Sequence, residues 1–156
     1  MKRSTIAVLL VVCVGGVAAL VALFLRLLPE VCTAEDDRLA ASLATLDILD
    51  AHPVNATPQG ERGSGCYDDG RIVTVSQFYR FSGPVADVLS FYRDAATMDG
   101  WKPPREGDGE RVSCFVKSID GRDVGFSAWV VEEDGRYGDE YQVDVTSSMT
   151  GSGGWC

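Results

Sequence analysis

The sequence is poor in the side chains on which most catalytic sites depend. It has one histidine, His52, which stands beside Pro53 in a predicted loop. A Ser-His-Asp or Cys-His site needs a histidine within reach of its nucleophile, and zinc sites rest on histidines and cysteines at short spacings. One loop histidine and no CxxC pair argue against both kinds of site and against a thioredoxin-like redox motif.

Nucleotide-binding motifs and basic charge are scarce as well. The sequence has no GxSxG elbow and no dinucleotide fingerprint, and GERGSGC at 60–66 lacks the lysine of a P-loop. From Glu30 onward the chain carries all 23 acidic residues but 11 of the 14 basic ones, a net charge of −12. That field repels nucleic acid and anionic lipid headgroups. We therefore expect no catalytic residues, no cofactor, no metal and no nucleic-acid partner.

Two clusters of carboxylates are the remaining candidates for chemistry. Asp68 and Asp69 adjoin a glycine, and five acidic residues crowd residues 132–140. Neither cluster has the calcium-loop spacing with glycine at position six and glutamate at twelve. A carboxylate pair for glycoside hydrolysis needs a cleft, for which a domain this small leaves little room. A calcium sensor or a small hydrolase built on these clusters is the alternative to a non-enzymatic function.

Residues 6–25, IAVLLVVCVGGVAALVALFL, form a long uncharged run. As a helix this run would measure about 30 Å, the thickness of a bilayer's hydrocarbon core, and it exceeds the usual apolar part of a signal peptide. We predict a signal anchor, with residues 1–5 in the cytoplasm, a transmembrane helix at 6–28 and the C-terminal domain outside the cell membrane. The alternative is a secreted protein cut before Glu35, which would lose Cys32 and leave an odd number of outer cysteines.

Four cysteines follow the apolar run: Cys32, Cys66, Cys114 and Cys156. In an exported domain they predict two disulfides, with three connectivities open. We favour Cys66–Cys114, which would link the two halves of a sheet. We favour Cys32–Cys156 as the second pair, because it would tie the ends together and order the Gly/Ser-rich tail at 150–156. The competing interpretation leaves Cys156 free to bond a partner protein.

The pattern of apolar residues predicts an α+β domain over residues 29–149. Leucines at helical spacing predict a helix at 33–46, and a stripe that starts at Val85 predicts another at 84–100. Alternation predicts a central strand at 71–81, with Val73, Val75, Tyr79 and Phe81 on one face. Further strands are expected at 111–118, 124–131 and 141–146, the first two joined by an Asp120-Gly121 hairpin turn. A short strand at 46–49 and a loop at 50–65 complete the prediction of an antiparallel sheet with helices packed on one face, behind an N-terminal transmembrane helix.

The block YRFSGPVADVLSFYRDAATMDGW at 79–101 precedes a strand that contains a cysteine. It resembles small membrane-anchored or secreted envelope proteins of the actinobacterial type, which carry a helix of the form v…FY…GW and have no known activity. The likeness covers residues 66–131 and rests on Phe91, Tyr92, Gly100 and Trp101. It implies an envelope location and this fold, and it brings no activity with it.

Together these patterns predict a non-enzymatic, single-pass membrane protein of the bacterial envelope. Its acidic, disulfide-stabilised outer domain is expected to bind another envelope component, a protein or a cell-wall component. Exposed aromatic side chains are enriched at interfaces, so the candidate contact residues are Trp129, Trp155 and, if the second sheet face is uncovered, Phe78. For Trp129 the alternative is that its ring fills the core.

Overall fold

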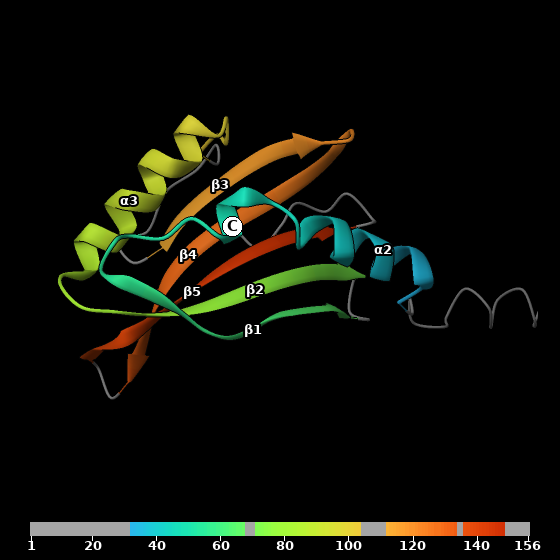
Figure 1. The fold of residues 1–156 in the computed structure, drawn as a ribbon. Helices are drawn as coiled ribbons and strands as arrows, with labels where there is room; N and C mark the ends of the chain where they lie inside the picture. Colours follow the sequence, from blue (N-terminus) through green and yellow to red (C-terminus); the bar gives the residue numbers. More distant parts are fainter. Residues whose placement is uncertain (1–31, 68–70, 104–111, 134–135, 149–156) are drawn as a thin grey trace, which may run out of the picture. The chain divides into compact units, whose positions relative to one another are not determined.

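Five antiparallel strands form one sheet in the spatial order β1-β2-β5-β4-β3 (Figure 1). The computed structural model describes residues 32–67, 71–103, 112–133 and 136–148. Strands β3, β4 and β5 form the predicted meander, and β2 pairs with the other side of β5 and holds β1 at the edge. The strand bounds are β1 Ala56–Tyr67, β2 Ile72–Phe81, β3 Val112–Ile119, β4 Arg122–Glu133 and β5 Arg136–Ser148.

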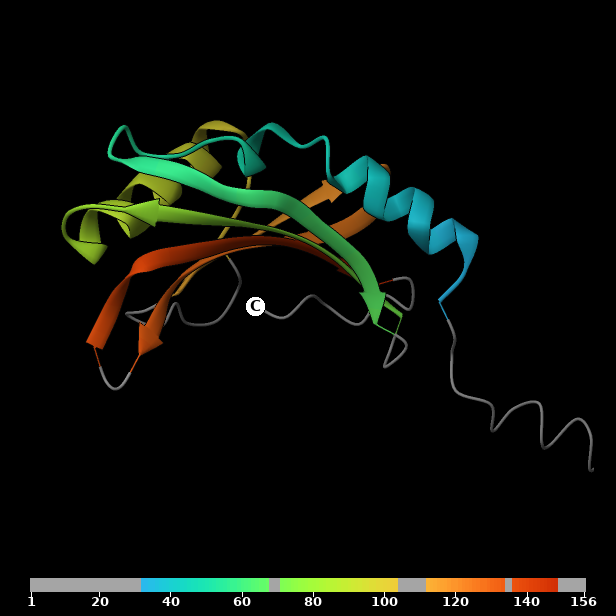
Figure 2. The same ribbon diagram turned by 60° about the horizontal axis from the view of Figure 1, so that its bottom comes forward.

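Both described α-helices lie on the same face of the sheet (Figure 2). They are α2 (Ala34–Leu43) and α3 (Val85–Met98), and the short 3-10 helix η1 (Asp47–Leu49) lies on that face too. The predicted α+β arrangement is therefore confirmed for the described ranges. The predicted transmembrane helix at 6–28 lies outside them. Within these ranges, no helix has the length and apolar character needed to span a bilayer.

A buried carboxylate fixes the start of α2. Asp36 lies in the first turn with its side chain fully buried, and its Oδ2 accepts hydrogen bonds from the backbone N–H of Thr33 at 2.7 Å and from the Thr33 hydroxyl at 2.8 Å. Arg71, in the turn before β2, forms an ion pair with the same carboxylate at 2.9 Å. Burial alone would raise the pKa of Asp36, but the hydrogen bonds from Thr33 and Arg71 outweigh it and hold the pKa below its ordinary value.

The end of α3 follows from one glycine. Gly100 has φ +80°, a conformation that residues with a side chain rarely adopt. Its N–H donates to the carbonyl of Thr97 at 3.1 Å, and the N–H of Trp101 donates to the carbonyl of Ala96 at 2.9 Å, which together make a Schellman motif. The turn sends the Trp101 ring into the core, as predicted. At the other end Pro84 is the N-cap, so α3 begins at Val85, one residue after the predicted start at Pro84.

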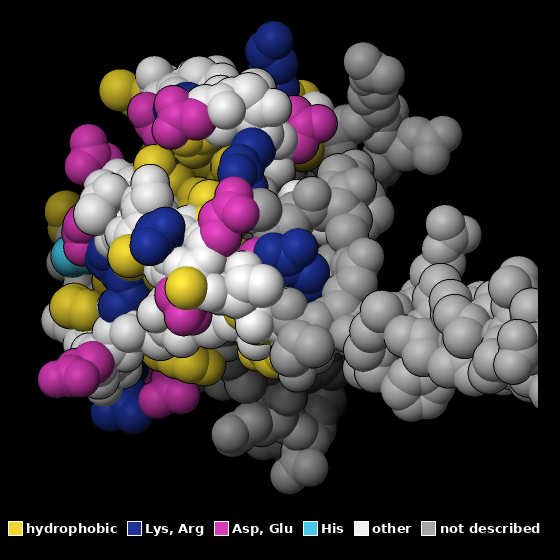
Figure 3. Space-filling model, turned by 90° about the vertical axis from the view of Figure 1, so that its right-hand side faces the viewer, with side chains coloured by type: hydrophobic (Ala, Val, Ile, Leu, Met, Phe, Trp, Pro, Cys, Tyr) yellow, Lys and Arg dark blue, Asp and Glu magenta, His cyan; other side chains and the backbone are white. Residues whose placement is uncertain are grey.

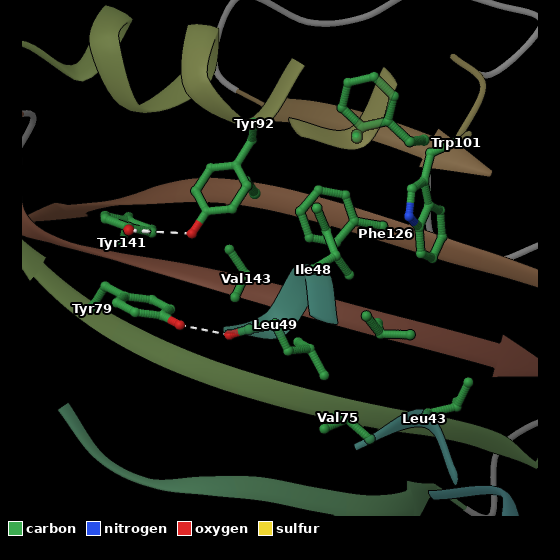
Figure 4. Close-up of a cluster of buried hydrophobic side chains, with 14 of the residues drawn as sticks. Leu43, Ile48, Leu49, Val75, Tyr79, Tyr92, Trp101, Phe126, Tyr141 and Val143 are labelled. Carbon is green, nitrogen blue, oxygen red and sulfur yellow. Dashed lines mark hydrogen bonds between the residues drawn. The ribbon is translucent and has the colours of Figure 1, made fainter. Parts of the chain in front are cut away.

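Three tyrosine hydroxyls join the helical layer to the sheet (Figure 4). Tyr79 of β2 donates to the carbonyl of Leu49 at 2.5 Å, and Tyr92 of α3 donates to the carbonyl of Ala51 at 2.7 Å. The Tyr92 hydroxyl also lies 3.2 Å from that of Tyr141 on β5, and burial raises the pKa of all three groups. Other core residues are Val73, Val75, Phe81, Val88, Trp101, Phe126, Val143 and Val145, which confirms the predicted inward face of β2.

The prediction of a loop at 50–65 is wrong, because strand β1 begins at Ala56. The prediction of a short strand at 46–49 is also wrong, because the 3-10 helix η1 occupies this part of the chain. Only Ala56 of the strand is fully buried, so no alternation of apolar residues marks it. An edge strand hydrogen-bonds along one side only, and it tolerates Pro58 and the glycines that otherwise indicate a loop. A register shift between Gln59 and Gly63 further breaks the two-residue period.

The Asp36 carboxylate gives the first prediction. Because its folded pKa lies below the ordinary 3.8, it stabilises the fold above that value, and this contribution is lost as the pH falls through the folded pKa. We expect Asp36→Asn to lower the free energy of unfolding at neutral pH and to flatten its decline below about pH 4, as measured by urea denaturation. Asp37→Asn, at the exposed neighbour, is the control. An unchanged acid profile in Asp36→Asn would contradict the assignment.

Candidate interaction surface

The face of the sheet opposite α2 and α3 is here called the open face. Strand alternation and the register of the four strand pairs identify its residues, since partners directly opposite each other share a face. No described helix covers this face (Figure 2). Its residues include Tyr67 of β1, Thr74, Ser76 and Phe78 of β2, Gln142 and Asp144 of β5, Ser127 and Trp129 of β4, and Cys114 and Val116 of β3.

A carboxylate lies near the middle of the open face and holds three neighbours. Asp144 Oδ1 accepts hydrogen bonds from the Ser76 hydroxyl at 2.5 Å and from Gln142 Nε2 at 2.6 Å, while Oδ2 accepts one from Trp129 Nε1 at 2.7 Å. These four residues are called the Asp144 network. With both oxygens engaged by neutral donors, the carboxylate orients side chains on three strands, and we assign it a positioning role.

Two aromatic side chains project from the open face on the side of β1 and β2. Tyr67 is 64% exposed and Phe78 is 42% exposed. Tyr67 pairs with Ile72, which lies six residues from Phe78 along β2. The backbone positions of Tyr67 and Phe78 are therefore about 20 Å apart along the strands. Between them the facing positions of β1 are Gly63 and Gly65, at which an added Cβ would lie no nearer than 4.0 Å to its surroundings. The result is a flat strip with an aromatic group at each end.

The structure brings two of the three predicted contact residues together. Phe78, Gln142 and Trp129 occupy one cross-strand row. Trp129 is half-buried and lies on the open face, away from the core cluster that packs under the helices. Trp155 lies outside the described residues. The sequence analysis missed Asp144 and Tyr67. The alternation of Tyr141, Val143 and Val145, which face the core, was the signal that places Asp144 on the opposite face. Tyr67 had no such signal, because it follows a stretch predicted as a loop.

The cysteine pairing differs from the prediction. Cys32 and Cys66 form a disulfide with their Cα atoms 6.0 Å apart, which joins the start of α2 to the end of β1. The favoured pairs Cys66–Cys114 and Cys32–Cys156 are therefore wrong. The reason is distance: β1 and β3 are opposite edges of the sheet, about 19 Å apart at four strand spacings, whereas bridged Cα atoms lie within about 7 Å of each other. Cys66 also faces the helices, while Cys114 lies on the open face.

The candidate catalytic and metal residues do not gather into one site within the part of the chain that the structure describes. His52 is exposed; its Nδ1 donates to the carbonyl of Pro53 at 3.0 Å, and its ring lies 5.3 Å from that of Tyr79. On β5, Glu140 and Asp139 form ion pairs with Arg80 of β2 at 2.7 and 3.5 Å. Within the described ranges no three histidine, cysteine or acidic residues gather as a metal site would require. Residues 68 and 69 lie outside those ranges.

A shallow groove of about 330 Å³ runs between α2 and the β3–β4 hairpin. Leu39, Leu43 and Ile119 supply apolar walls, and an ion pair between Glu35 and Arg122 at 3.2 Å reaches across it. Figure 3 shows this side of the molecule, on which side chains of both charges lie among hydrophobic ones. Since acidic and basic groups balance in its lining, the groove favours no ligand charge.

No protein-family model, curated protein or solved structure matches the chain. A function for this chain must therefore be argued from its own residues.

The Asp144 network gives the second prediction. Asp144→Ala removes the acceptor of three hydrogen bonds and leaves partly buried donors on three strands. We expect a loss of about 1–3 kcal/mol in the free energy of unfolding, the usual cost of unsatisfied polar groups, together with a change in Trp129 fluorescence. Asp94→Ala on the exposed side of α3 is the matched control. Equal stabilities of the two variants would show that the network does not hold the open face.

Proposed function

We propose that the chain is a non-enzymatic, single-pass membrane-anchored protein of the bacterial envelope whose outer domain binds another envelope component through the open face. The observation that carries the binding part of the proposal is the exposed pair Tyr67 and Phe78, on a sheet face that no described helix covers. Large aromatic side chains lose little conformational freedom on binding and dominate the energetics of interfaces. The Asp144 network beside them adds polar side chains whose positions are already fixed by hydrogen bonds before a partner binds.

The Cys32–Cys66 disulfide supports the location outside the membrane. Disulfides persist in oxidising compartments and are rare in the cytoplasm. Cys32 lies four residues after the predicted transmembrane helix at 6–28, so the bridge would anchor the domain directly where the chain leaves the bilayer. The v…FY…GW resemblance points to the same compartment.

The chemistry of the surface supports recognition. Both oxygens of Asp144 accept hydrogen bonds from Ser76, Gln142 and Trp129, so the carboxylate holds neighbouring side chains in place on the proposed surface. The acidic charge of the outer domain favours partners that are neutral or basic. The strip between Tyr67 and Phe78 is flat and about 20 Å long, dimensions that suit an extended segment of a partner protein.

The third prediction tests this surface. A photo-reactive amino acid at Thr74, between the two aromatic positions, should form an adduct with an envelope protein in intact cells. The double variant Tyr67→Ser with Phe78→Ser should reduce the adduct yield about tenfold or more, as the loss of two interface aromatics implies. Its melting temperature should stay unchanged, because both side chains are exposed.

Met98→Ser is the matched control, since Met98 is 88% exposed but lies at the end of α3. It should leave the adduct yield unchanged. An adduct that a glycan-cleaving enzyme removes would assign the partner to the cell wall. No adduct in the parent chain, or the same yield in the double variant, would contradict binding at this surface.

A further inference from the structure

The two edges of the sheet differ in whether they can take another strand (Figure 1). On β3 the edge is closed at Val116: its N–H donates to the carbonyl of Lys102 at 2.7 Å, and the N–H of Lys102 donates to the carbonyl of Val116 at 2.9 Å. Along the outer side of β1 lies no described strand or bridge. An edge of this kind presents unpaired backbone groups and is a template for an extended chain.

The register of the strand pairs shows which backbone groups of β1 point outward. In an antiparallel sheet the N–H and C=O groups of successive residues point alternately to the two sides of the strand. Since Val116 bonds outward to Lys102, the next residue points inward to β4. The alternation passes across the sheet through the pairs of Lys117 with Val124, Gly125 with Thr146, Val145 with Val75 and Thr74 with Gly65. Gly65 therefore points to β2, and its neighbours Ser64 and Cys66 point outward.

The open part of this edge is short and unprotected. Pro58 and the register shift between Gln59 and Gly63 interrupt its first half. Over residues 63–67 the register is regular, with none of the lysines, prolines or bulges that usually protect an edge. No other described residue bonds to the outward backbone groups of Ser64 and Cys66. They offer two donors and two acceptors about 7 Å apart along the strand, the repeat that an extended peptide presents in its own backbone.

The surroundings of this edge indicate what the added segment carries. Gly65 lies on the open face, and a Cβ added to it would have no atom within 4 Å, so bare backbone adjoins the exposed ring of Tyr67. In an added strand the residue opposite Gly65 forms a non-hydrogen-bonded pair, the kind in which side chains approach most closely. A large apolar side chain there would cover the glycine and reach Tyr67. The net charge of −12 from Glu30 onward favours a neutral or basic segment and opposes pairing with a second copy of the chain.

We propose that the partner binds by strand addition: an extended, neutral or basic segment of an envelope protein pairs with residues 63–67 as a sixth strand of the sheet. Its backbone bonds to the outward groups of Ser64 and Cys66, and one large apolar side chain lies over Gly65 beside Tyr67. Backbone pairing supplies affinity, and the side chain over Gly65 supplies selectivity. This inference rests on the proposed function and specifies how the partner engages that surface.

Proline at residue 64 tests the strand addition. Ser64→Pro removes an outward N–H and no hydrogen bond between β1 and β2, so the domain should keep its melting temperature. With the photo-reactive amino acid at Thr74, we expect the adduct yield in intact cells to fall at least about fivefold, the factor that one lost hydrogen bond implies. Ser118→Pro, at an outward position of β3, is the matched control and should leave the yield unchanged. A parent-level yield in Ser64→Pro would overturn strand addition.

A second variant keeps the test decisive if the proline disturbs the fold. Gly65→Val fills the space over the strand without a clash and should lower the adduct yield to a similar extent, with no loss in melting temperature. An unchanged yield in Gly65→Val would refute the placement of the partner side chain. Loss of the adduct in Tyr67→Ser with Phe78→Ser, but not in Ser64→Pro or Gly65→Val, would support the proposed function and refute strand addition alone.

Amide hydrogen exchange tests the edge without a partner. In the full chain in detergent, the amides of Ser64 and Cys66 should exchange at least about tenfold faster than that of Gly65, because only Gly65 donates to β2. Equal protection of the three amides would show that the edge is already occupied and would overturn the proposal. Protection that grows with protein concentration, in a chain that sediments as a dimer, would assign the edge to a second copy.

Discussion

The two described α-helices cover one face of the five-stranded sheet, and the rest of the described structure depends on that constraint. The covered face holds the whole described core, in which tyrosine hydroxyls from β2 and α3 bind the carbonyls that precede β1. The open face contacts water or a binding partner, and no described helix packs on it. The residues of the open face include a hydrogen-bonded carboxylate, small side chains and a few aromatic rings. The covered face thus carries the described core, and the opposite face is the surface for which we propose recognition.

The sequence predicts the parts of the fold in which burial imposes a period. Alternation along β2 and the stripe along α3 were sufficient because one side of each element faces the core. The glycine that ends α3 and the Asp120-Gly121 turn are readable because their backbone conformations restrict the residue type; both turn residues have positive φ. Strand β1 could not be predicted in this way, because an edge strand with one buried residue shows no periodic pattern of apolar residues.

The candidate surface was predictable only in part, for related reasons. Phe78 and Trp129 follow from the alternation of their strands, but their common row depends on the strand order, which places β5 between β2 and β4. That order rests on contacts between residues far apart in the chain. The disulfides fail for the same reason: four cysteines fix a count, while the pairing depends on which edge and which face each one occupies. Cys66 and Cys114 differ in both.

Recognition by the open face requires that the domain lies outside the membrane, and lysine labelling tests this most directly. The chain has three lysines, of which Lys2 precedes the predicted anchor and Lys102 is exposed on the domain. In intact cells a membrane-impermeant amine reagent should modify Lys102, while Lys2 should react only after permeabilisation, with both peptides recovered from one chain. Protection of Lys102 until the cells are opened, or loss of the Lys2 peptide from the chain, would contradict the account.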